Sequence, residues 1–185
     1  MSIADIINLG FWGALFVIVV FKFLKSIRVV PAQSAYIVER LGKYSRTLGP
    51  GFHALIPFLD EVPFKIDLKE ETLEVPPQEC FSKDEVKIQV DGVIYLSVTD
   101  PSKAAYGVTN YRYAAMQLAQ TTTRSVIGTL ELDRTFEERE QISARVVEVL
   151  DRAGQLWGIR VHRYEIKKLQ PPESVRVSME KQVTA

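Results

Sequence analysis

The sequence has little of what metal and thiol chemistry requires. Cys80 is the only cysteine in 185 residues, which excludes an intrachain disulfide and a thiolate metal cluster. The only two histidines, His53 and His162, have no histidine or glutamate at zinc-motif spacing. A phosphate-binding glycine loop is missing, and Ser125 lacks the flanking glycines of a nucleophile elbow. We therefore expect no catalytic residue, no metal and no cofactor, so the protein is not expected to be an enzyme.

The chain also lacks net charge. Its 23 basic and 23 acidic side chains cancel, whereas binding to a phosphate backbone needs a basic excess. We expect no nucleic-acid partner. The length of 185 residues is sufficient for one domain of about 100–150 residues and a short additional segment.

One long stretch of the chain lacks charge altogether. It runs for 16 residues from Ile6 to Phe21, and Asn8 is its only clearly polar side chain. Lys22 and Lys25 have long apolar stems, so Phe23 and Leu24 extend the apolar stretch towards the roughly 20 residues that cross a bilayer. We predict a transmembrane helix within residues 1–27, with the lipid-facing side chains Ile6, Phe11, Trp12, Leu15, Val19, Phe21 and Leu24.

Two other interpretations of this stretch fit less well. A signal peptide begins with basic residues, but here Asp5 comes first. A re-entrant hairpin usually needs a central break, and the stretch contains no proline. Because Lys22, Lys25 and Arg28 all follow the stretch, the positive-inside rule places the large domain in the cytoplasm. The same three cations are predicted to contact anionic headgroups.

The rest of the chain changes its hydrophobic period along its length. Residues 86–99 alternate between apolar and polar side chains, which predicts a strand with one buried face, and Gly92 is a candidate bulge or close-packing point. Shorter strands are predicted at 34–40, 62–67, 72–75 and 159–169, the last with a bulge between Arg163 and Tyr164. A helix is predicted over 111–127. Another begins at Thr135, with Glu138 in a capping box and Gly154 as its end. This order indicates an α+β domain with an antiparallel or mixed sheet and packed helices.

Several motifs, in the right order, resemble the stomatin/prohibitin (band 7, SPFH) family. They are Val38-Glu-Arg-Leu-Gly-Lys-Tyr, Leu48-Gly-Pro-Gly-Phe-His-Ala-Leu-Ile-Pro, Arg124-Ser-Val-Ile-Gly-Thr-Leu-Glu-Leu-Asp and Trp157-Gly-Ile-Arg-Val. The resemblance is greatest to bacterial and organellar stomatin-like proteins. It implies a membrane anchor at 1–27, an SPFH domain at 28–170 with two lobes meeting near residue 99, and the start of a C-terminal helix or coiled coil at 171–185.

The resemblance also implies a function. Such proteins are non-enzymatic scaffolds that assemble into rings or cages and organise membrane microdomains. The implied partners are further copies of the chain, the lipid bilayer and membrane-protein clients, including a membrane protease or an NfeD-type protein. A single-pass location in a bacterial inner membrane or an organellar membrane follows. The alternative is an accessory subunit that regulates one membrane protease or ion channel.

Two sets of residues are candidate contacts. A turn-rich apolar segment either fills the core or dips into the headgroup layer, with the side chains Phe52, Leu55, Ile56, Phe58 and Leu59. The helices after residue 135 and after Pro172 are expected to supply oligomer contacts, through Glu138, Arg139, Arg145, Glu148, Arg152, Val175, Met179 and Val183.

Overall fold

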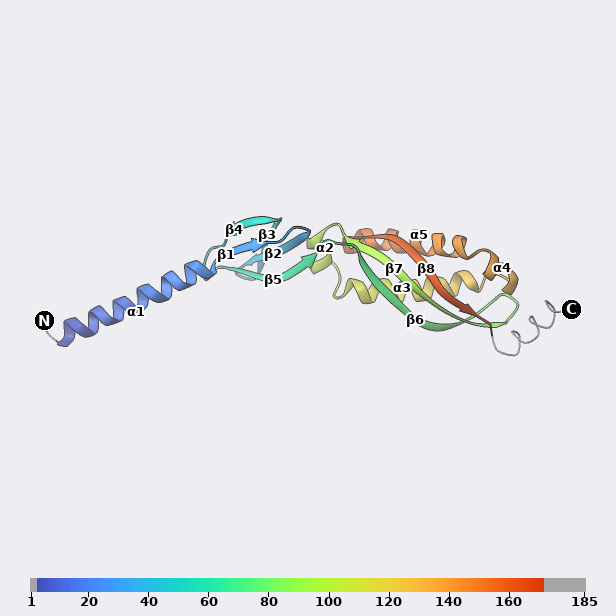
Figure 1. Cartoon of the computed structure of the whole chain (residues 1–185), viewed down its shortest axis with the longest axis horizontal. Coiled ribbons are helices and arrows are strands. Elements are labelled where there is room, and N and C mark those ends of the chain that lie inside the picture. The colour runs from blue at the N-terminus through green and yellow to red at the C-terminus, as the bar shows by residue number, and fades with distance from the viewer. Residues whose placement is uncertain (1–2, 172–185) are drawn as a thin grey trace. The chain divides into compact units, whose positions relative to one another are not determined.

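The computed structural model describes residues 3–171, apart from the side chains of residues 3–7 and 9. It divides into two compact units, a first unit at Met1–Leu68 and a second unit at Lys69–Ala185 (Figure 1). The division therefore falls well before the expected lobe boundary near residue 99. The predicted C-terminal helix, with Val175, Met179 and Val183, lies outside the described residues, as does the Ile6 side chain.

The first unit begins with the helix α1 (Ile3–Lys25), where the sequence predicted an anchor. From Gly10 to Lys25 every side chain is exposed, although most are apolar. A helix that is apolar on all sides is normally buried, in a large core or in a membrane. The predicted transmembrane span is nevertheless not confirmed. Among the described residues, no helix combines the length and apolar character needed to cross a membrane.

Two small antiparallel sheets complete the first unit. β1 (Ile27–Val30) pairs with β4 (Gly51–Ala54), and β2 (Ser34–Arg40) lies between β3 (Lys43–Leu48) and β5 (Asp60–Asp67). A small core joins the two sheets and consists of Val30, Val38, Leu48 and Leu55, with Tyr36 and Val62 packed against it. The sequence predicted β2 and most of β5. It did not predict β1, β3 and β4, which are short and have weak alternation.

The second unit is one antiparallel sheet covered by helices. β7 (Lys87–Val98) lies between β6 (Glu71–Phe81) and β8 (Ile159–Gln170). The helices between β7 and β8 are α2 (Pro101–Tyr106), α3 (Tyr111–Ile127), α4 (Leu132–Glu137) and α5 (Arg139–Trp157). α3 packs on β6 and α5 packs on β8 (Figure 1). The alternating apolar residues of β7, among them Ile88, Ile94 and Leu96, are buried, so the α+β prediction is confirmed.

The start and end predicted for the α5 helix are wrong. Thr135 lies inside α4, fully buried, and its hydroxyl donates to the carbonyl of Glu131 instead of capping a helix. α5 begins at Arg139 and runs past Gly154 to Gly158, whose φ of +66° suits glycine at a helix end. Gly154 is small for a packing reason: an added Cβ would lie 2.9 Å from the carbonyl oxygen of Ile159.

Both outer strands of the second sheet are irregular. β6 shifts register between Val75 and Gln78, where Pro76 and Pro77 interrupt it. β8 shifts where Leu96 pairs with Val161 and Tyr95 with Arg163, which leaves His162 as the extra residue. The bulge predicted between Arg163 and Tyr164 is therefore present, displaced towards His162.

Gly92 is a close-packing point, as the sequence predicted. An added Cβ would lie 2.6 Å from the Tyr164 hydroxyl oxygen and within 2.8 Å of its ring. The ring cannot easily move, since Tyr164 is buried and its hydroxyl accepts a hydrogen bond from Thr123 at 3.1 Å.

We expect Gly92→Ala to lower the free energy of unfolding by about 1–3 kcal/mol, because the extra carbon overpacks the sheet against Tyr164. Urea unfolding followed by circular dichroism measures the change. Gly49→Ala is the matched control, since a Cβ at Gly49 would meet nothing within 4 Å. Equal stabilities of the two variants would contradict the close contact.

Candidate membrane-binding surface

The β1–β4 ribbon presents an apolar outer face directly after α1. Ile27 pairs with Ala54 and Val29 with Phe52, and all four residues are exposed. Val29 is 69% and Phe52 66% exposed, although they are neighbours that could cover each other. The alternate residue Val30 faces inward and belongs to the core. The ribbon therefore separates a core face from an apolar face that no described part of the chain covers.

The loop before β5 is only partly core, so the core interpretation does not hold for all of its residues. Leu55 is 8% exposed and belongs to the core, so its assignment as a membrane contact is wrong. Ile56, Phe58 and Leu59 are exposed, and Phe58 is 72% exposed. Contact of these three side chains and Phe52 with lipid stays a prediction.

Leu41, in the β2–β3 turn, belongs to the same surface and was not predicted. It is 76% exposed, and its backbone N–H donates to the carbonyl of Leu59 at 3.2 Å. Leu41 and Phe58 have φ values of +51° and +70°, a region that bulky residues rarely adopt. Strain of this kind costs about 1–3 kcal/mol and concentrates at functional sites. Leu41 stands beside Gly42 in a turn, where an exposed leucine is unusual. This leucine was the sequence feature from which the contact could have been predicted. We call Ile27, Val29, Leu41, Phe52, Ile56, Phe58 and Leu59 the apolar surface.

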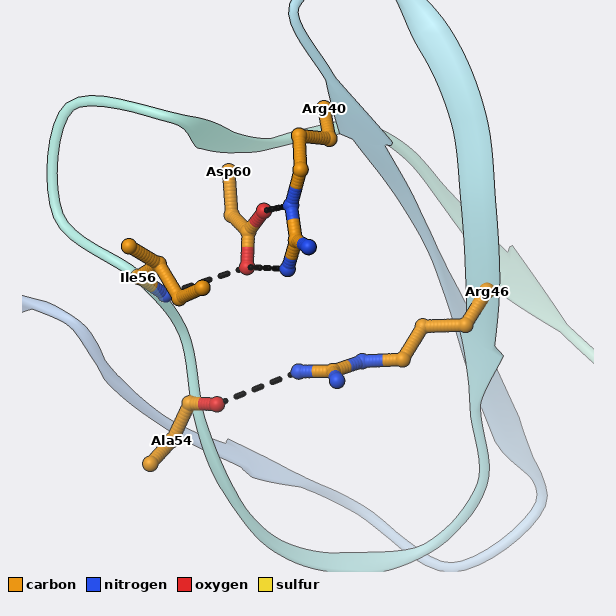
Figure 2. A network of polar contacts seen from close by, with 5 residues as sticks. All are labelled: Arg40, Arg46, Ala54, Ile56 and Asp60. Carbon is orange, nitrogen blue, oxygen red and sulfur yellow. Dashed lines mark hydrogen bonds and ion pairs between the residues drawn. The ribbon is translucent and has the colours of Figure 1, made fainter.

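An ion pair holds the turn and the loop together. Figure 2 shows the Asp60 carboxylate accepting from Arg40 Nε at 2.7 Å and from Arg40 Nη2 at 3.2 Å. Its second oxygen also accepts from the backbone N–H of Ile56 at 3.0 Å. Nearby, Arg46 donates to the carbonyl of Ala54 at 3.2 Å, which ties β3 to the end of β4. The network fixes the backbone on which Leu41 and Phe58 are held outward.

The charges of this network are unequally exposed. The Asp60 side chain is fully buried, whereas that of Arg40 is 40% exposed. The Arg40 hydrogen bonds lower the pKa of Asp60, although burial acts in the opposite direction. Asp60 therefore stays ionised, and its charge is neutralised by Arg40.

The three predicted headgroup cations lie at the end of α1, beside this surface. Lys22 Nζ lies 5.4 Å from the centre of the Phe58 ring, and Lys25 Nζ lies 4.8 Å from that of Phe21. Arg28 is exposed on β1. The backbone of Leu55 donates to Ser26 at 2.9 Å, so the loop is bonded directly to the end of the helix. The structure thus brings the basic residues and the loop together.

The predicted oligomer contacts on α5 have partners within their own chain. Glu148 bridges Arg145 at 2.6 Å and Arg152 at 3.0 Å. Arg139 lies over the Phe136 ring, and Glu138 pairs with Arg134 at 3.7 Å. Arg145, Glu148 and Arg152 follow one another at a spacing of three to four residues on α5 and are exposed, whereas the Glu138 side chain is only 25% exposed. Contact of any of these residues with another copy stays a prediction.

The described residues contain no group of three or more His, Cys, Asp or Glu side chains arranged to hold a metal. Cys80 is fully buried, and burial raises the pKa of its thiol.

Comparison with known proteins identifies a family and several relatives that this chain resembles. The family described as SPFH domain / Band 7 matches residues 28–185. Stomatin-like protein 2, mitochondrial, of Homo sapiens is 48% identical over 156 residues, which cover 84% of this chain and 44% of that protein. A stomatin-like protein of Caenorhabditis elegans is 43% identical over 159 residues, 86% of this chain and 49% of that protein. An uncharacterized protein of Methanocaldococcus jannaschii is 40% identical over 175 residues, 95% of this chain and 87% of that protein. The chain thus spans less than half the length of its mitochondrial relatives.

We expect acid to weaken the first unit through Asp60. Because its folded-state pKa lies below the ordinary value of about 3.9, its stabilising effect is complete above that value and is lost as the pH falls through the folded-state pKa. Asp60→Asn should be less stable than the wild type at pH 7, and the difference should shrink on acidification towards pH 3. Thermal unfolding across this range tests it.

The control for this experiment is Glu79→Gln, which removes an equally short but exposed ion pair, Lys87–Glu79 at 2.7 Å. Exposed pairs contribute about 0–1 kcal/mol, so this variant should be close to wild type at every pH. A difference for Asp60→Asn that is constant with pH would contradict the role assigned to Asp60.

Proposed function

Because the chain belongs to the SPFH domain / Band 7 family, we propose that it is a membrane-bound, non-enzymatic scaffold that assembles laterally with copies of itself. The observation that carries the proposal is α1, which is apolar on all sides and has no covering partner within the described chain. A helix without a polar stripe can be covered by lipid on all sides.

In this proposal α1 embeds its side chains in the bilayer and the apolar surface rests in the adjoining headgroup layer. Burying a Phe, Leu or Ile side chain contributes about 1.5–3 kcal/mol, so the few exposed apolar side chains of the surface suffice to fix the first unit against the membrane. The exposed loop positions then orient a unit that α1 alone would leave free to rotate.

Lateral assembly follows from confinement. An anchor restricts the subunits to two dimensions and raises their effective concentration, so weak contacts are enough to close a ring. The charged face of α5 suits this role, because its pairs are exposed and can exchange partners between copies. Membrane-protein clients would be gathered by such an assembly.

We infer the location of the protein from its relatives. Proteins named as mitochondrial and a relative from the bacterium Mycobacterium bovis both match this chain. We propose an organellar or bacterial membrane, with the second unit in the aqueous phase.

The membrane role is tested at single positions of the full chain. We expect the environment-sensitive dye NBD, attached to Phe58→Cys, to shift its emission to the blue in phosphatidylcholine proteoliposomes and to be quenched by lipids that carry a doxyl group. The reason is that the 72% exposed Phe58 side chain would lie among lipid chains or headgroups. The native Cys80 should not be labelled, since it is fully buried.

The matched control is the same dye at Leu156→Cys, because Leu156 is equally exposed, at 74%, but lies in the second unit. The dye there should be quenched little. Equal quenching at both positions, or none at Phe58, would count against the apolar surface as a lipid contact.

The scaffold role is tested by reversing charge on α5. The double variant Arg139→Glu with Arg145→Glu should reduce the copy number per particle in detergent, as seen by single-particle imaging, if this face joins copies. Lys87→Glu with Arg163→Glu makes the same charge change on β7 and β8 and should leave the particles unchanged.

A wild-type particle containing many copies supports the scaffold. A wild-type monomer bound to one partner would instead favour an accessory subunit of a protease or channel. Unchanged particles for the α5 variant would remove α5 from the interface.

A further inference from the structure

A cavity opens between the end of α1 and the loop before β5, both within the first unit. Its volume is about 400 Å³, within the range of small-molecule sites. Leu55, Phe58 and Val62 supply apolar walls, and Lys22, Lys25 and Arg28 also line it. The Leu55 to Ser26 backbone hydrogen bond, 2.9 Å long, joins the two sides of the cavity.

The charges around this cavity do not cancel. Within the described residues, Lys22, Lys25 and Arg28 have no carboxylate within 4.0 Å, and the two lysines lie over aromatic rings instead. Two acidic residues also line the cavity, Asp60 and Glu61. Asp60 is already neutralised by Arg40. Three cations against one remaining carboxylate, Glu61, leave a local charge of about +2.

We propose that this cavity binds the phosphodiester headgroup of an anionic phospholipid. An anion satisfies the three cations, and the apolar walls and the adjoining α1 suit the first carbons of the lipid chains. The inference rests on the proposed membrane function and adds a ligand to it. The cavity recognises the phosphate chemistry, and its position at the end of α1 selects the lipid as the source.

The test measures lipid retained by the full chain in a non-ionic detergent, by native mass spectrometry with phosphatidylglycerol and phosphatidylcholine as probes. The wild type should retain phosphatidylglycerol in preference. Lys22→Gln, Lys25→Gln and Arg28→Gln together should weaken that retention at least about tenfold, since each cation near a membrane contributes about 1 kcal/mol. Lys43→Gln, Lys65→Gln and Lys69→Gln remove the same charge away from the cavity and should leave the preference intact.

A second pair of variants distinguishes binding in the cavity from attraction by the overall positive charge of the region. Glu61→Gln should strengthen retention of phosphatidylglycerol, because it removes the carboxylate that lines the cavity and is not neutralised. Glu70→Gln makes the same charge change outside the cavity and should have no effect. Equal effects of Glu61→Gln and Glu70→Gln, or of the two triple variants, would overturn the site.

The remaining outcomes distinguish the ligand source and the underlying function. Displacement of phosphatidylglycerol by millimolar inorganic phosphate would show a site for free phosphate and overturn the lipid assignment; resistance to displacement supports it. If the wild type binds phosphatidylcholine vesicles but shows no headgroup preference, this inference fails and the membrane function stands. If the wild type binds no vesicle at all, the proposed function itself fails.

Discussion

The Arg40–Asp60 ion pair is the constraint on which the first unit depends. Arg40 ends β2 and Asp60 begins β5, so one contact closes two neighbouring chain reversals, and the Ile56 N–H uses a remaining acceptor of the carboxylate. A buried carboxylate with fewer donors would be costly, and breaking such a pair usually destabilises more than the pair itself contributes. Leu41 and Phe58 lie next to these two residues, in backbone conformations that hydrophobic residues resist. Without the network, those segments would relax and their side chains would turn inward or collapse on each other.

The core of the first unit is small, and the apolar residues outside it are large. Val30, Val38, Leu48 and Leu55 fill the interior, while phenylalanines and leucines are held in solvent around the end of α1. Scattered exposed apolar side chains are ordinary in soluble proteins, but Leu41 and Phe58 are also held at positive φ. One set of apolar residues therefore forms the core of the unit, and another set remains exposed among the described residues. Lys22 and Lys25, at the end of α1, line one cavity together with Leu55 of the core and the exposed Phe58.

The sequence predicted the parts of the fold that depend on repeated burial. The apolar residues of β7 recur with the period of a strand and those of α3 with the period of a helix. Gly92 was identified as a close-packing point because it interrupts an apolar face. The prediction failed where tertiary contacts overrode local signals: Thr135 reads as a helix cap but is buried within α4, and Gly154 reads as a helix end but makes room for Ile159. The basic residues of the candidate surface were predictable from their position beside the apolar stretch. Leu41 was not, because its turn meets the loop only in the folded chain, through the Arg40–Asp60 pair and the hydrogen bond to Leu59.

The irregular outer strands of the second sheet limit how the edges of this sheet can pair with the strands of other chains. Pro76 and Pro77 remove two hydrogen-bond donors from β6, and the extra residue at His162 bends β8. An exposed, regular strand is a template for the strand of another chain, so regular edges would let the copies of the proposed assembly add to each other without limit. The interruptions at both edges disfavour extension of the sheet by strands of other chains. In the proposed assembly, copies would therefore reach high density on a bilayer while remaining separable, which is the difference between a reversible coat and an aggregate.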